Sequence, residues 1–185
     1  MNNLVFIVNR ILSLVTVAGD ILILLFIIFF LLKKLSLIKL LSRYSFHFAL
    51  IVSLIATLGS LFYSEIAKFE PCRLCWYQRI IMYPQVILIS LAIIKKDRHL
   101  ADYLMALSAV GVLISSYHYY LQRGGQSIFP CSVVGYSASC STRFIMEFGY
   151  ITIPMMALTA FILIIILMVI SKIKPSPRII KSSRV

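Results

Sequence analysis

Charged residues are scarce in this sequence: they make up 13% of its 185 residues, against about 25% in an ordinary soluble domain. Acidic residues are scarcest, with 6 Asp and Glu against 18 Lys and Arg. Glycine and proline number 7 and 6, too few for a collagen-like or low-complexity chain. Because 61% of the residues are hydrophobic, the composition excludes a water-soluble globule and a disordered chain and predicts an integral membrane protein.

Five apolar runs are long enough to cross a bilayer as helices, at 1.5 Å per residue and about 30 Å of hydrocarbon. Open sheet edges cannot survive in lipid, so each run is expected to be a helix. The runs cover residues 11–32, 44–64, 77–94, 101–121 and 151–171. The fold class predicted is therefore all-α, with five membrane spans.

Basic residues are distributed unequally between the two sides of this five-span arrangement. One side receives Lys33, Lys34, Lys39, Arg43, Lys95, Lys96, Arg98, Lys172, Lys174, Arg178, Lys181 and Arg184. The other side receives Arg10, Lys68, Arg73, Arg79, Arg123 and Arg143. Positive loops stay in the cytoplasm, which predicts an N-terminus outside and a C-terminus inside. The net charge of +12 is thus explained by topology, and no nucleic-acid partner is expected.

The first run raises two further points. A cleaved signal peptide over residues 1–32 is the alternative to a span, but the basic residues follow the apolar run and no small-x-small cleavage site precedes Lys33. Asp20 lies inside this run, where an ionised carboxylate costs about 2.5–3.5 kcal/mol. We expect Asp20 to make a structural polar contact, with proton handling as the alternative.

All four cysteines, Cys72, Cys75, Cys131 and Cys140, lie in connections predicted to be extracytoplasmic. An even number facing an oxidising compartment indicates two disulfides or one exchanging system. Cys72 and Cys75 form a C-x-x-C pair just before a helix expected to begin near Trp76. Their small ring would add little stability as a staple, whereas a helix N-terminus favours a reactive thiolate. Redox exchange is therefore preferred to a structural pair or a metal site, and no metal is expected.

The second pair lies in the longest extramembrane segment, 122–149, whose Gly, Pro and Ser content is typical of flexible chain. A mobile disulfide beside a fixed one suits a relay by thiol–disulfide exchange. In such a relay, electrons from a soluble dithiol pass to Cys131 and Cys140 and then to Cys72 and Cys75. A terminal acceptor is then required.

A lipid-soluble quinone is the economical acceptor, because the sequence has no haem ligand pair, flavin fingerprint or iron–sulfur spacing. Arg79 lies one turn inside the expected helix and could bind a quinone oxygen or stabilise a Cys75 thiolate. Trp76, Gln78 and His118 are the other candidate quinone contacts. An interfacial aromatic belt is the alternative for the aromatic residues, and a satisfied bundle histidine is the alternative for His118.

At these residues the chain resembles the DsbB/BdbC family of disulfide bond formation proteins, especially its BdbC-like branch. The resemblance covers roughly residues 44–171. It rests on SEI (64–66), PCRLCWYQRI (71–80), MYP (82–84), YHY (117–119), GYITIP (149–154) and LTAF (158–161). It implies a four-helix bundle, ubiquinone or menaquinone as oxidant, and a DsbA/BdbD-like thioredoxin-fold oxidase as the partner.

The resemblance also implies a role for each functional residue. Cys75 would be the quinone-facing sulfur, Cys72 its partner, and Arg79 the quinone-associated arginine. Cys131 would be attacked by the soluble oxidase, and Cys140 would bridge transiently to Cys72. Two features depart from the usual pattern: the extra span within residues 1–35, and the short spacing of the second cysteine pair.

The sequence thus predicts three parts: an extra N-terminal transmembrane helix (1–35), a redox membrane domain (36–172) and a basic cytoplasmic tail (173–185). The expected function is a protein-dithiol:quinone oxidoreductase in a prokaryotic cell membrane. Three alternatives stay open: an outward-running reductant conduit, a vitamin K epoxide reductase-like enzyme, and a non-enzymatic scaffold with structural disulfides. Glu65, His118 and Asp20 are the candidates for proton handling.

Overall fold

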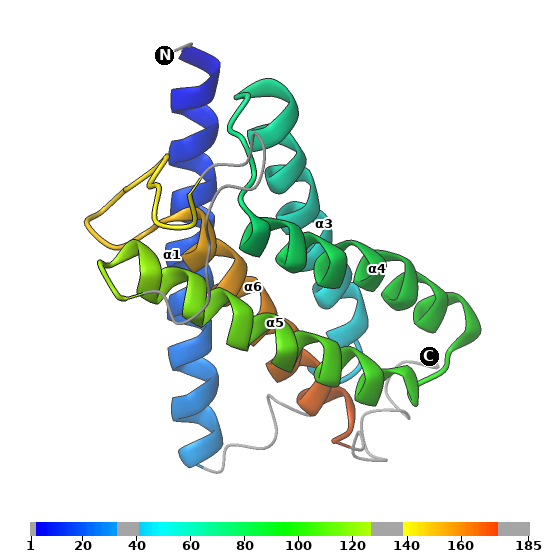
Figure 1. Ribbon diagram of the computed structural model, residues 1–185. Helices are drawn as coiled ribbons and strands as arrows, with labels where there is room; N and C mark the ends of the chain where they lie inside the picture. Colours follow the sequence, from blue (N-terminus) through cyan, green and yellow to red (C-terminus); the bar gives the residue numbers. More distant parts are fainter. Residues whose placement is uncertain (1–2, 33–40, 127–138, 174–185) are drawn as a thin grey trace.

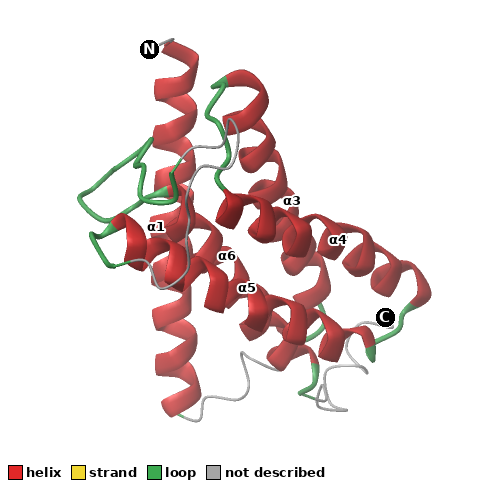
Figure 2. Ribbon diagram, viewed as in Figure 1, coloured by secondary structure: helices red, strands yellow, loops and turns green. Residues whose placement is uncertain are grey.

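Helices make up most of the structure, a computed structural model that describes residues 3–32, 41–126 and 139–173 (Figures 1 and 2). Five of the described helices are long and apolar enough to cross a membrane. They are α1 (Asn3–Leu31), α3 (Ser45–Leu61) continued by the π-helical turn η1 (Phe62–Ile66), α4 (Arg73–Lys95), α5 (Leu100–Gln122) and α6 (Ile153–Ser171). Strands are absent from these ranges, which contain one isolated bridge between Glu147 and Ile151. The predicted all-α membrane fold is confirmed.

The helix bounds differ from the predicted runs mainly at the N-terminus. Helix α1 begins at Asn3 rather than near residue 11, because Arg10 does not end the helix. Its guanidinium pairs with Glu147 at 3.3 Å and lies over the ring of Phe148. A charged residue that finds partners in the protein can lie within a helix that crosses the interface, so the charge alone did not mark the boundary.

Helix α6 lies among α1, α3 and α5 and carries much of the core (Figure 1). Phe161, Ile164 and Met168 are fully buried along it, as are Ile89 of α4 and Leu104 of α5. Helices α3 to α6 form the four-helix bundle. Lipid covers the outside of such a bundle, so the apolar residues exposed on α3, α4 and α5 face hydrocarbon rather than water.

Close packing of α5 against α6 depends on Gly111. A Cβ atom at this position would lie 2.6 Å from ring atoms of Phe161, closer than two carbon atoms can approach without displacement. Small residues at helix interfaces allow this close approach, which is a major source of association energy within lipid. The absence of a side chain at Gly111 therefore fixes the distance between the two helices.

Helix α1 packs outside the four-helix bundle, against α6. A Cβ on Gly19 would lie 2.9 Å from the Thr159 side chain, so the two backbones approach closely here. Asp20 accepts hydrogen bonds from the hydroxyls of Thr159 at 2.7 Å and Tyr150 at 3.2 Å. The structural contact expected of Asp20 is thus observed, and it joins α1 to α6.

Replacement of Gly111 by leucine is expected to destabilise the bundle by about 1–3 kcal/mol, because the new side chain overpacks the contact with Phe161. Thermal unfolding in detergent, followed by circular dichroism, measures the effect as a lower midpoint. Val110→Leu adds volume at the neighbouring exposed position and should leave the midpoint near that of the parent. Equal midpoints for Gly111→Leu and the parent would refute the role given to Gly111.

Candidate active site

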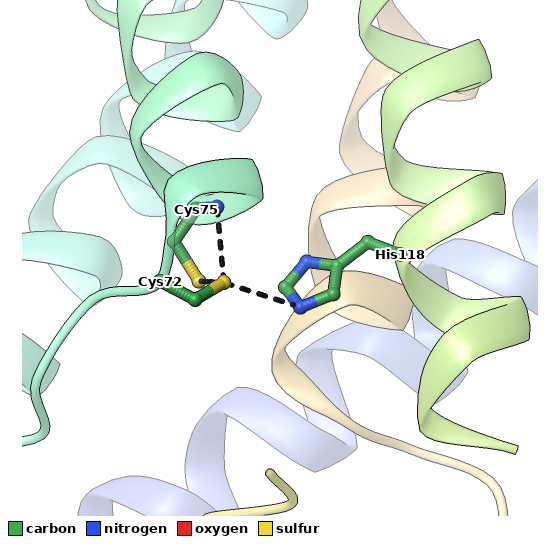
Figure 3. A group of neighbouring side chains, drawn as sticks. All are labelled: Cys72, Cys75 and His118. Atoms are coloured by element: carbon green, nitrogen blue, oxygen red, sulfur yellow. Dashed lines mark hydrogen bonds between the residues drawn. The ribbon is translucent and has the colours of Figure 1, made fainter. Parts of the chain in front are cut away.

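The two cysteines of the C-x-x-C motif begin helix α4. Cys72 is its N-cap residue, with extended backbone, and its sulfur accepts a hydrogen bond from the Cys75 backbone N–H at 3.4 Å. Cys75 lies in the first turn, so the two Sγ atoms are 3.2 Å apart (Figure 3). The helix begins at Arg73, three residues before the predicted start, and so includes Cys75. Unsatisfied N–H groups at a helix N-terminus favour negative charge, which here means a cysteine thiolate.

His118 of α5 approaches this pair from the side (Figure 3). Its Nε2 lies 3.5 Å from the Cys72 sulfur, and its Nδ1 lies 3.2 Å from the side-chain nitrogen of Gln78. The Gln78 amide nitrogen can only donate, so Nδ1 accepts and the ring proton is on Nε2, facing the sulfur. His118 and Gln78 are both buried, so this contact is shielded from water.

These contacts stabilise the ionised form of Cys72. The hydrogen bond with the Cys75 thiol is the largest cause, and burial opposes it. Together with the hydrogen bond and charge of His118, it lowers the pKa of Cys72 to about 4. Since an ordinary cysteine has a pKa of about 8.5, Cys72 is a thiolate at neutral pH. Such a sulfur is a good leaving group in disulfide exchange.

A cavity of about 160 Å³ opens beside Cys75, between α1, α3, α4 and α6. Cavities of about 150 Å³ lined by apolar side chains bind an aromatic ring the size of benzene. Cys75, Gln78 and Arg79 line this cavity from α4. Cys75 and Arg79 are four residues apart and so share one face of the helix.

Arg79 is held at the cavity wall by α3. Its Nε donates to the Ser60 hydroxyl at 3.0 Å and its Nη2 to the Ser60 carbonyl at 3.3 Å. The guanidinium also lies over the Trp76 ring, 5.4 Å from the ring centre. A guanidinium has five N–H donors, and these contacts within the described chain use two of them. Arg79 is therefore oriented and retains donors for a ligand oxygen.

Three stacked rings form another part of the cavity wall. Tyr63 stacks on Phe69 with ring centres 5.9 Å apart, and Phe69 stacks on Phe144 at 4.9 Å. The rings come from η1, from the segment before Cys72, and from the segment after Cys140. All three line the cavity. The stack thus holds the two cysteine-bearing connections together beside Cys75.

The four residues predicted to contact a quinone occupy different places. Arg79 and Gln78 line the cavity, and Gln78 also bonds to His118. Trp76 is 53% exposed and reaches the site through its contact with Arg79. His118 is not among the cavity-lining residues and lies against Cys72 instead. Ser60 and the stacked rings were missed, since nothing in their local sequence separates them from other span-end residues.

The second cysteine pair is partly described. Cys140 is 2% exposed and disulfide-bonded, and it belongs to one buried cluster with Cys72 and Leu121. The Gln122 side chain donates to the Thr142 carbonyl at 3.0 Å and so ties this segment to the end of α5. Cys131 lies outside the described residues. Cys72 is therefore buried beside Cys140, while Cys75 packs against this cluster and also lines the cavity.

A metal ion has one candidate set of ligands among the described residues. The sulfurs of Cys72 and Cys75 and a ring nitrogen of His118 all lie within 4.8 Å of one another, a donor set that suits zinc or copper(I). A disulfide-bonded cysteine offers no thiolate, so Cys140 cannot complete a four-cysteine zinc site in this state. The free thiols of Cys72 and Cys75 suit redox exchange directly.

Replacement of His118 by leucine is expected to raise the pKa of Cys72, because the sulfur loses the Nε2 donor. The ultraviolet absorbance of the thiolate, followed while the reduced protein is acidified, measures this pKa. In the parent the thiolate persists as the pH falls toward about 4, and in the variant it disappears at higher pH. Cys72→Ser, which lacks this thiolate, is the control. Identical midpoints would show that His118 does not stabilise the sulfur.

Comparison with known proteins gives the family. Residues 42–171 match the family described as disulfide bond formation protein DsbB. Disulfide bond formation protein C of Bacillus subtilis is 49% identical over 124 residues, which cover 66% of this chain and 88% of the relative. A probable disulfide formation protein C 1 of Bacillus cereus is 48% identical over 115 residues, 60% and 80% of the two chains. No solved structure matches significantly. The C-x-x-C pair at the N-terminus of a membrane helix agrees with this match, which covers most of the chain. The protein belongs to the DsbB family of disulfide bond formation proteins.

Proposed function

We propose that the protein is a membrane thiol:quinone oxidoreductase that reoxidises a DsbA/BdbD-like thioredoxin-fold oxidase. The observation that carries this proposal is that one cysteine pair touches both the second cysteine pair and the cavity. Cys72 and Cys140 belong to one buried cluster, against which Cys75 packs, and Cys75 also lines the cavity that holds Arg79. Electrons entering from one side of the pair can leave on the other without movement of α4.

The first half of the cycle is disulfide exchange. A partner thiolate attacks Cys131 in the Cys131–Cys140 disulfide, and the partner's second thiol closes its own disulfide, leaving Cys131 and Cys140 reduced. The Cys140 thiolate then attacks Cys72 in a Cys72–Cys75 disulfide and releases Cys75 as a thiolate. Attack of Cys131 on Cys140 releases Cys72 and restores the second disulfide. The low pKa of Cys72 favours its departure in this last step.

The second half returns the Cys72–Cys75 pair to its disulfide. The two thiols lose two electrons and two protons, which is the amount that converts a quinone into a quinol. Arg79 would bind a quinone oxygen and stabilise the negative charge that develops there. Either ubiquinone or menaquinone fits this chemistry.

Proton handling is assigned to His118 among the three predicted candidates. The Nε2 of His118 lies 3.5 Å from the Cys72 sulfur, so among the three candidates His118 is the titratable group close enough to exchange a proton with a redox sulfur. Asp20 is engaged by Thr159 and Tyr150, and Glu65 is exposed on η1 outside the cavity lining. These two positions do not contact a redox sulfur.

The orientation proposed is the one predicted by the basic residues, with the N-terminus and the cysteine connections outside the cytoplasm and the C-terminus inside. Cys72 is the N-cap of α4, whereas Lys95 and Lys96 lie at the C-terminal end of this membrane-spanning helix. The relatives are bacterial proteins, so the membrane is proposed to be the cell membrane of a prokaryote. Membership of the DsbB family disfavours the epoxide reductase alternative, and free Cys72 and Cys75 disfavour the scaffold.

Replacement of Cys75 by serine is expected to abolish quinone reduction, because no second sulfur is left to close the disulfide with Cys72. The partner oxidase should still be captured at Cys131 as a mixed disulfide. Quinol formation by absorbance and non-reducing electrophoresis measure the two effects, with Cys131→Ser as the control that loses capture. Quinol production by Cys75→Ser, or loss of capture in it, would contradict the proposed order.

Replacement of Arg79 by alanine is expected to raise the apparent KM for quinone by about tenfold, the effect of losing a charged hydrogen bond of about 1.5 kcal/mol. The rate of capture of the partner oxidase should not change. Arg73→Ala removes the same charge from an exposed position on the same helix and serves as the matched control. A parental quinone KM in Arg79→Ala would remove this residue from the acceptor site.

A further inference from the structure

Helix α1 lies outside residues 42–171, the part of the chain that matches the DsbB family. It nevertheless contributes Leu12, Val15 and Thr16 to the lining of the cavity beside Cys75. The extra span is thus part of the cavity from which the reducing equivalents are proposed to leave. A helix serving only as a membrane anchor would have no need to reach this cavity.

Helix α1 closes the groove between α3 and α6. On the α3 side, the Leu12 side chain packs against Gly59, where a Cβ would lie 3.2 Å from it. On the α6 side, Gly19 packs against Thr159 and Leu163. Cavity-lining residues of α1 therefore lie over the groove, and without α1 this side of the cavity would open directly to lipid.

Specific polar contacts hold α1 in this position. Asp20 is bound by Thr159 and Tyr150, and Arg10 pairs with Glu147. Polar groups within lipid find few other partners, so such contacts favour one orientation of a helix over others. The face of α1 that carries Leu12 and Thr16 is consequently directed at the bundle, while Leu14 is 58% exposed on another face.

The cavity has a polar wall and an apolar wall. Arg79 and Cys75 form the polar wall with Ser60. Leu12 and Val15 of α1 form the apolar wall together with Val52, Ile55 and Ala56 of α3. The Thr16 hydroxyl donates to the Leu12 carbonyl at 2.8 Å, so its bond is satisfied within α1. The apolar wall suits a branched hydrocarbon chain and offers nothing to a quinone oxygen.

We propose that α1 is the tail-binding wall of the acceptor site and selects quinones by their isoprenoid tail. This inference rests on the proposed quinone reaction and adds to it a residue set that the matched part of the chain does not contain. The quinone ring lies at Arg79 and Cys75, and the first tail units lie between α1 and α3. Tail affinity then contributes to quinone KM, while the chemistry at Cys75 is independent of α1.

Val15→Phe tests the proposal, because it adds a ring to the apolar wall at a half-exposed position that tolerates volume. Two quinones with the same ring are compared: menadione, which has no tail, and a menaquinone with an isoprenoid tail. We expect at least about a fivefold increase in KM for the tailed quinone, as overpacking of this size produces. The KM for menadione and the rate of partner capture should stay close to the parental values.

Leu14→Phe makes the same kind of addition on the exposed face of α1 and should behave as the parent does. If Val15→Phe does not accumulate in the membrane, Leu12→Ala replaces it, and widening the wall should change the KM for the tailed quinone alone. Parental KM values for both quinones in the α1 variants would overturn the proposal while leaving quinone reduction intact. A parent protein that reduces neither these two quinones nor ubiquinone would instead overturn the proposed function.

Discussion

The start of helix α4 at Arg73 is the constraint on which the rest of the site depends. It makes Cys72 the N-cap and puts Cys75 in the first turn, so the helix N–H groups, the Cys75 thiol and His118 all act on one sulfur. Arg79 then follows one turn after Cys75 on the same face. A helix beginning a few residues later would lose both the stabilised thiolate and the alignment of Cys75 with Arg79.

Lipid explains why such a site needs so few polar residues. The bundle leaves its outer surface to hydrocarbon, and polar side chains are kept for contacts between helices, as with Ser108 and Gln85 or Asp20 and Thr159. The cavity beside Cys75 also has few polar groups: Ser60 binds Arg79, and most of the remaining wall is apolar. The proposed lipid-soluble acceptor would reach this cavity through the membrane, whereas the proposed partner oxidase would meet the cysteines from outside it.

Much of the fold was predictable because length and hydropathy determine membrane spans, and the family match confirms the resemblance inferred from the motif around Cys72 and Cys75. The position of Arg79 also followed from helical spacing. The docking of α1 was not predicted, although the face that it buries carries Asn9, Ser13, Thr16 and Gly19, small or polar residues at helical spacing. Ser60 and Phe144 reach the cavity through contacts distant in sequence, which no local pattern encodes. His118 was predicted as a quinone contact, and its bond to Cys72 depends on the packing of α5 against α4.

The central claim is that the cysteines pass electrons to a quinone dissolved in the bilayer. The most direct measurement is an anaerobic titration of the purified protein with dithiol and quinone, in which thiol loss and quinol gain are followed together. The account predicts one quinol formed for every two thiols lost, with no other acceptor present. Persistence of the thiols in the presence of quinone, or their oxidation without quinol formation, would contradict it.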